Sequence, residues 1–203
     1  MNVTCIVVDN GEDSLEECIL SLRNQTLKPY VLVVGGPNTD YSLARELADD
    51  VLGPIEGIGR ARVEGVLKSD SPIIVCCDSD STYHESYVYF VVEDLKSFKA
   101  VKAGTVLPKR VEPLGIAEMI FTPVIPYEYT LSFRRDAFLD AGIHLEDYSD
   151  PREDIGWYVS LRLFPILDPR LVVYTRMPTR NAKIISEIPL IPVYLIRSIG
   201  VRG

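Results

Sequence analysis

Short apolar runs alternate with amphipathic segments through the first part of the chain. Residues 3–8, 30–34 and 73–77 are apolar and rich in β-branched side chains, which is typical of strands buried on both faces of a sheet. After the first run, apolar residues recur at helical spacing along one face: Leu15, Cys18, Ile19 and Leu22. This alternation predicts a parallel sheet that is flanked by helices.

Turn and cap signals place the other elements of the first half. Ser14 and Glu17 have the spacing of a capping box at the start of the first helix. A second helix is expected at about 41–48, followed by a short strand near Val51. Gly57 and Gly59 then mark a turn that leads into a helix ending near residue 68.

The second half of the chain is less regular. We expect a helix over 83–97, a strand over 100–107 and loops over 111–129. Asp150 and Pro151 are typical of the N-cap and first position of a further helix, and residues 171–175 of a last strand. The sequence therefore predicts one α/β domain with a mostly parallel, Rossmann-like sheet over 1–175, divided into halves at residue 80, and an apolar tail over 176–203.

Composition narrows the class of protein. The chain has 47% hydrophobic and 25% charged residues with a formal net charge of −8, which argues against a broad nucleic-acid-binding face because phosphate contacts need clustered cations. The cysteines lie in apolar stretches without zinc-ligand spacing: Cys5, Cys18, Cys76 and Cys77. We expect buried thiols in a cytoplasmic protein, since the chain also lacks the pattern of a secretory signal and any run of the ~20 apolar residues that span a bilayer.

Candidate chemistry follows the third strong strand. Asp78-Ser79-Asp80 comes directly after the run 73–77, at the carboxyl end where doubly wound sheets bind ligands. Residues two apart in an extended chain point the same way, so both carboxylates are expected to hold one Mn²⁺ or Mg²⁺ ion. Such a cation would bind the diphosphate of a nucleotide ligand. An acidic turn after a strand, without a ligand, is the alternative.

The order of these blocks resembles family 2 glycosyltransferases, which have the GT-A fold. The similarity is dense from Val3 to Asp80 and continues more thinly to Leu163. Besides the strands it rests on three blocks: Leu15-Glu-Glu-Cys-Ile-Leu-Ser-Leu-Arg-Asn-Gln-Thr26, Asn38-Thr39-Asp40 and Gly59-Arg-Ala-Arg-Val-Glu-Gly65.

The resemblance implies a donor site built from the first half of the chain. It maps Asp9, Asn10 and Asp40 to the nucleoside, and places Arg62 near the nucleotide with Asp78 and the metal ligand Asp80. A surface arginine of the helix is the alternative for Arg62. Paired acids are usual in the family where Gly35 and Gly36 stand here, which leaves a UDP donor in question.

The resemblance implies an acceptor site in the second half. Asp154 matches the family's general base, which takes the proton of the attacking hydroxyl, and a solvated first-turn carboxylate is the alternative. Glu153 either contributes to this site or completes a helix cap. Trp157 and Tyr127 are weaker acceptor candidates, with core packing as the alternative.

These observations predict a metal-dependent, inverting glycosyltransferase that uses a nucleotide-sugar donor. The acceptor is a glycan, a lipid-linked sugar or a protein, and no nucleic acid is expected as a partner. The apolar residues 184–196 either rest on the inner face of a membrane, close the core or pair the chain into a homodimer. The competing hypotheses are a non-catalytic nucleotide-sugar-binding protein and a sugar nucleotidyltransferase, although the latter usually carries a Gly-rich loop and a lysine where Asp9-Asn10-Gly11-Glu12 is acidic.

Overall fold

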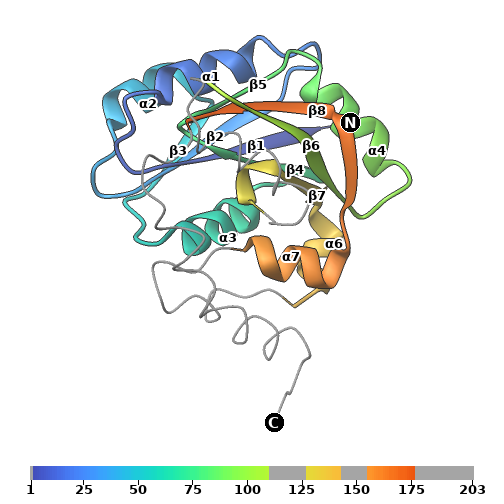
Figure 1. Cartoon of the computed structure of the whole chain (residues 1–203). Helices are drawn as coiled ribbons and strands as arrows, with labels where there is room; N and C mark the ends of the chain where they lie inside the picture. The colour runs from blue at the N-terminus through green and yellow to red at the C-terminus, as the bar shows by residue number, and fades with distance from the viewer. Residues whose placement is uncertain (1, 110–126, 143–154, 177–203) are drawn as a thin grey trace.

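A computed structural model describes residues 2–109, 127–142 and 155–176 of the chain. Its first half alternates strands and helices (Figure 1) in the order β1 (Val3–Asp9), α1 (Leu15–Arg23), β2 (Tyr30–Gly35), α2 (Tyr41–Leu47), β3 (Asp50–Leu52), α3 (Ile58–Lys68) and β4 (Ile73–Asp78). Strand β1 pairs in parallel with both β2 and β4, and β2 pairs in parallel with β3. The predicted parallel sheet of the first half is confirmed.

The second half completes the sheet with strands of both directions. Its elements are β5 (Ser81–Tyr83), α4 (Tyr87–Leu95), β6 (Ala100–Pro108), the short 3₁₀ helix η1 (Glu128–Thr130), β7 (Leu131–Arg134), α6 (Arg135–Asp140), α7 (Gly156–Leu163) and β8 (Ile166–Thr175). The strand order is β3-β2-β1-β4-β7-β6-β8-β5. Strand β7 runs antiparallel to β4 and β6, β5 runs antiparallel to β8, and β6 pairs in parallel with β8. The fold is therefore the predicted α/β class, with a mixed sheet.

Helices cover both faces of this sheet (Figure 1). On one face, α1, α2 and α4 pack on strand residues such as Val7 and Val33. On the other face, α3, α6 and α7 pack on residues such as Ile6 and Leu32. Neighbouring strand residues point to opposite faces, so the continuous apolar runs fill both cores.

Three predicted details differ from the structure. Ser14 precedes α1 without a side-chain cap hydrogen bond, and the carboxylate of Glu17 lies 3.1 Å from Lys109 Nζ, so the predicted capping box is not formed. The helix predicted over 83–97 begins only at Tyr87, since Tyr83 belongs to β5 and pairs with Val173 of β8. The last strand also begins earlier than residue 171, because Ile166 and Leu167 extend it along β6.

The four cysteines are free and buried, as predicted. Burial raises the pKa of the Cys5, Cys18 and Cys76 thiols, so these thiols stay protonated at neutral pH. None of the helices in the described ranges has the length and apolarity that a membrane crossing requires.

Candidate functional site

The carboxyl ends of β1, β2 and β4 lie side by side and carry the predicted donor-site residues. In the sheet register Asp9 is opposite Gly35, and Val8 is opposite Asp78. Asp9 and Asp78 therefore end adjacent strands at one edge of the sheet. This edge is where open α/β sheets bind ligands.

Asp9 organises the loop that follows β1. Its carboxylate is buried and accepts hydrogen bonds from the backbone N–H groups of Gly11 at 3.0 Å and Glu12 at 3.1 Å. Its backbone carbonyl accepts from Gly36 N at 2.7 Å and from Thr39 Oγ1 at 2.9 Å, which joins the loops after β1 and β2. The structure thus gives Asp9 a loop-shaping role at the predicted nucleoside site.

Gly36 allows these two loops to approach each other closely. A Cβ atom at Gly36 would lie 2.4 Å from Asn10 Oδ1, in the exposed tip of the first loop. A side chain there would require Asn10 to move. Gly36 stands where the family usually has an acidic residue, and its missing side chain leaves the space that Asn10 occupies.

Asp40 lies at the start of α2 rather than among the strand ends. Its Oδ1 atom accepts from Ser42 N at 3.0 Å and Leu43 N at 3.1 Å, which makes Asp40 the N-cap of that helix. An N-cap aspartate is explained by helix stability alone. Its contact with the nucleoside stays a prediction.

Arg62 is fully buried, so the alternative of a surface arginine is wrong. Its Nη2 atom donates to Asp78 Oδ1, and its Nη1 atom donates to the carbonyl oxygens of Ile6 at 3.1 Å and Cys77 at 2.6 Å. Burial lowers the pKa of Arg62, but the carboxylates of Asp78 and Glu128 raise it by more. The guanidinium thus stays charged and holds the first aspartate of the Asp78-Ser79-Asp80 turn.

Glu128 is the second carboxylate partner of Arg62, and the sequence did not predict this pair. Arg62 Nε lies 3.2 Å from Glu128 Oε2, and the backbone N–H of Ile155 donates to Glu128 Oε1. Arg62 and Glu128 are 66 positions apart. Local patterns carry no signal for such a pair.

Asp80 lies in the turn between β4 and β5. Its Oδ1 atom accepts from the hydroxyls of Ser81 at 3.0 Å and Thr175 at 3.4 Å. The prediction assumed an extended chain at Asp78-Ser79-Asp80, but Ser79 and Asp80 lie in a turn. The carboxylate of Asp78 contacts a cation and that of Asp80 contacts hydroxyls, and their convergence on one metal ion stays a prediction. The two hydroxyls are functional candidates that sequence reasoning missed.

The carboxylates at this edge could hold a divalent cation whose other ligands are phosphate oxygens and water. The described ranges contain no group of three or more His, Cys, Asp or Glu side chains placed to hold a metal. Mg²⁺ commonly uses one or two carboxylates together with phosphate oxygens and water. With Arg62 bound to Asp78, Asp80 is the better candidate for the direct metal ligand.

The predicted acceptor residues are only partly described. Tyr127 is buried and its ring stacks on that of Tyr129, with centroids 5.5 Å apart. Trp157 lies in α7, but its side chain is outside the described part of the structure, as are Glu153, Asp154 and the predicted helix start at Asp150. The tail over 177–203, with its predicted membrane or subunit contacts, also lies outside.

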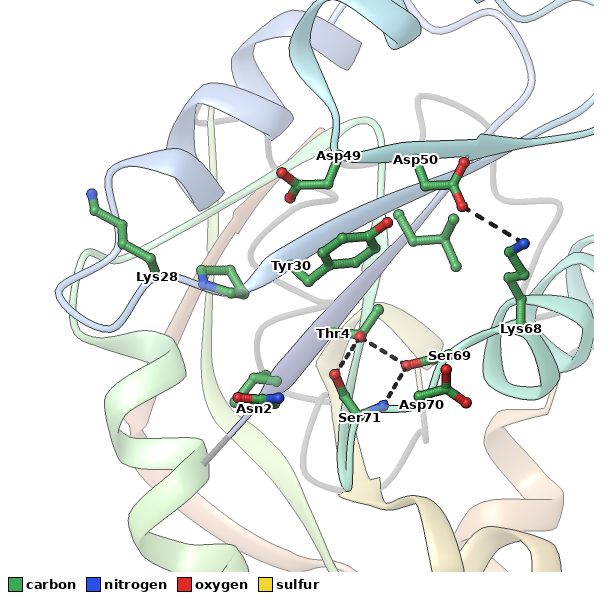
Figure 2. Close-up of a pocket in the computed structure, with 13 residues that line it drawn as sticks. Asn2, Thr4, Lys28, Tyr30, Asp49, Asp50, Lys68, Ser69, Asp70 and Ser71 are labelled. Carbon is green, nitrogen blue, oxygen red and sulfur yellow. Dashed lines mark hydrogen bonds and ion pairs between the residues drawn. The ribbon is translucent and has the colours of Figure 1, made fainter.

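A large cleft occupies the opposite edge of the sheet (Figure 2). It has a volume of about 710 Å³ and lies at the amino ends of β1 and β2. The side chains of Thr4, Ser69 and Ser71 hydrogen-bond to one another in it. We favour the carboxyl edge as the donor site because the family-like blocks and the Asp78-Ser79-Asp80 turn lie there.

Comparison with solved structures supports the fold. A crystal structure of S. aureus TarS residues 1–349 in complex with UDP-GlcNAc matches with a TM-score of 0.67 at 16% identity, covering 97% of this chain and 67% of that chain. A second TarS crystal structure matches with a TM-score of 0.65 at 17% identity, and this chain spans 40% of its length. The structure of TarS 1–349 in complex with UDP gives 0.62 at 16% identity, with coverages of 97% and 66%.

Comparison of the sequence establishes the family. No curated protein matches the chain. The family described as glycosyl transferase family 2 matches residues 4–144, which is more than half of the chain. The chain therefore belongs to glycosyl transferase family 2, a family of glycosyltransferases.

Proposed function

We propose that the chain transfers a sugar from a nucleotide-sugar donor to a hydroxyl group of an acceptor. The observation that carries this proposal is the meeting of Asp9, Asp78 and Asp80 at the carboxyl edge of the parallel strands, in a chain that belongs to a glycosyltransferase family. The TarS complexes with UDP-GlcNAc and UDP make a UDP-sugar the first donor to test.

Asp80 is the proposed ligand of Mn²⁺ or Mg²⁺, with Asp78 beside it. The cation, when bound, would offset the negative charge on the leaving nucleoside diphosphate. The hydroxyls of Ser81 and Thr175 orient the Asp80 carboxylate. The loop that Asp9 shapes provides the surface for the nucleoside.

Asp154 is the proposed general base. In a single displacement, the acceptor oxygen bonds to the anomeric carbon as the nucleoside diphosphate leaves, which inverts the configuration. The carboxylate takes the proton of the attacking oxygen. The anomeric configuration of the product, measured by NMR, tests this step. A product that retained the donor's configuration would overturn the role of Asp154.

The deciding experiment measures binding and hydrolysis of UDP-, GDP- and dTDP-sugars with and without Mn²⁺. Asp80→Asn removes the charge of the proposed metal ligand with little change in volume. We expect the variant to lose metal-dependent turnover by a factor of at least about 100, as expected when a charge-stabilising group is removed. Asp70→Asn is the matched control, because Asp70 is an exposed aspartate at the opposite edge.

The outcomes separate the competing hypotheses. Metal-dependent turnover that is lost in Asp80→Asn and kept in Asp70→Asn supports the proposal. Nucleotide binding without any turnover of the donor indicates a non-catalytic binding protein. No binding of any donor at millimolar concentration removes the proposed donor site.

A further inference from the structure

The buried carboxylate of Glu128 joins two parts of the molecule that are distant in the sequence. Its Oε2 atom contacts Arg62 of α3, and its Oε1 atom accepts the backbone N–H of Ile155, the residue that precedes α7. The side chain of Glu128 is 4% exposed and that of Arg62 is 0% exposed. Both side chains of this ion pair are therefore shielded from water.

The same guanidinium is fixed to the donor side of the sheet. Its Nη2 atom binds Asp78, and its Nη1 atom binds the backbone carbonyls of Ile6 in β1 and Cys77 in β4. These contacts hold the guanidinium plane in one orientation. A continuous path of hydrogen bonds therefore runs from Asp78 through Arg62 and Glu128 to Ile155.

We propose that Arg62 and Glu128 are positioning residues that hold the start of α7 in a constant place relative to Asp78. This inference rests on the proposed function, in which Asp78 lies on the donor side. Asp154, the proposed base, directly precedes Ile155 in the sequence. The path of hydrogen bonds would set the distance between the carboxylate of Asp78 and the start of α7.

Energetics favours a geometric role over a purely stabilising one. A buried ion pair recovers little more than the cost of removing its charges from water, and apolar residues of similar size are often as stable. The buried N–H of Ile155 needs an acceptor, but that acceptor need not be an ionised side chain. The Arg62–Glu128 pair is directional, however, and it restricts both of the segments that it joins.

Glu128→Gln tests the path with little change in volume. Its amide still offers one carbonyl oxygen to Ile155, but its NH₂ group then faces Arg62 Nε, so one of the two bonds is lost. Asp49→Asn is the matched control. Asp49 also joins an arginine to a backbone amide, accepting from Arg23 Nη1 at 2.8 Å and Val31 N at 2.7 Å, but at the opposite edge.

Two measurements are made with UDP and Mn²⁺ on the full chain. In the wild type, bound UDP is expected to slow amide hydrogen exchange in residues 155–163. In Glu128→Gln this slowing is expected to disappear, while the dissociation constant for UDP stays within about twofold. The kcat for hydrolysis of UDP-GlcNAc should fall at least about tenfold in Glu128→Gln and stay unchanged in Asp49→Asn.

The results distinguish failure of the path from failure of the function. Slowing of exchange by UDP that is equal in Glu128→Gln and the wild type would overturn the positioning role. A loss of kcat that is equal in Asp49→Asn would assign the effect to stability and overturn it too. If Glu128→Gln does not fold, Glu128→Asp keeps the charge but shortens the reach toward Ile155, and the same expectations apply. A wild type that binds no nucleotide would remove the proposed function and the path with it.

Discussion

At the scale of single residues, a second group of charges joins α4 to β8. Arg170 Nη2 lies 2.8 Å from Asp94 Oδ1 and 2.7 Å from Asp168 Oδ2, and its guanidinium lies over the ring of Phe90. Burial, followed by the neighbouring Asp168, raises the pKa of Asp94 to about 6. Burial also raises the pKa of Asp168, but hydrogen bonds with Arg170 and Asp94 together lower it by more. One cation thus serves two carboxylates.

This arrangement makes stability depend on pH through Asp94. A folded-state pKa near 6, above the unfolded value of 3.8, means that protonated Asp94 favours the folded state. The contribution is complete below about pH 4 and is lost as the pH rises through 6. We expect the free energy of unfolding of the wild type, minus that of Asp94→Asn, to fall by on the order of 2 kcal/mol between pH 4 and 7.

Urea unfolding at several pH values checks this expectation. The difference between wild type and variant removes the contributions of the carboxylates that lie away from Asp94, which titrate alike in both proteins. A difference that is constant from pH 4 to 7 would contradict a raised pKa of Asp94.

At the scale of elements, α3 holds Arg62 in place by packing directly on β1 and β2. A Cβ atom at Gly65 would lie 2.6 Å from Ile6 Cγ2 and 3.2 Å from Val34 Cγ2. The helix therefore needs a residue without a side chain where it crosses the sheet. Arg62 lies three positions earlier on α3 and donates to backbone carbonyls of β1 and β4.

Gly65→Ala is expected to lower the free energy of unfolding by about 1 kcal/mol. Overpacking costs about 1–3 kcal/mol, and the better helix propensity of alanine returns at most about 1 kcal/mol. A double-mutant cycle with Ile6→Ala, measured by urea unfolding, tests the cause. Gly65→Ala should cost less in the Ile6→Ala background, because the contacting methyl group is gone. Strictly additive effects would show that another contact is responsible.

At the scale of the whole molecule, the two edges of the sheet offer different groups to an anionic ligand. The carboxyl edge carries Asp78 and Asp80, and its anionic ligand would need a cation between them. The lining of the cleft at the amino edge has two lysines, Lys28 and Lys68, beside three aspartates, Asp49, Asp50 and Asp70. Lys68 lies 3.9 Å from Asp50, so a diphosphate there would meet lysines that neighbouring carboxylates partly neutralise. The residues that resemble the family lie at the carboxyl edge.

The double variant Lys28→Ala/Lys68→Ala decides between the edges. Calorimetric titration with UDP and Mn²⁺ at fixed ionic strength should give a dissociation constant within about twofold of the wild type, because distant exposed charges are screened by salt. Asp80→Asn should weaken binding in the same experiment. A loss of more than about tenfold in the lysine variant would place the nucleotide in the cleft.

Local patterns determined the elements of the first half. Strands β1, β2 and β4 are buried on both faces, so each appears as a continuous apolar run between turn residues. Their position before helices predicted the parallel order, and this order placed Asp9 and Asp78 at one edge. The sequence therefore predicted where the candidate donor site lies, at the carboxyl ends of β1 and β4.

Only the tertiary structure decided which groups pair within that location. Arg62 meets Glu128 across 66 positions and Asp80 meets Thr175 across 95, because strands from the two halves complete one sheet. Glu17 illustrates the same limit, since its spacing suits a cap but its carboxylate faces Lys109, which is 92 positions away. Periodicity is a property of neighbours in the chain, so it predicts the elements and the edge at which they end. Side-chain partners depend on how distant elements pack, and no local pattern encodes that packing.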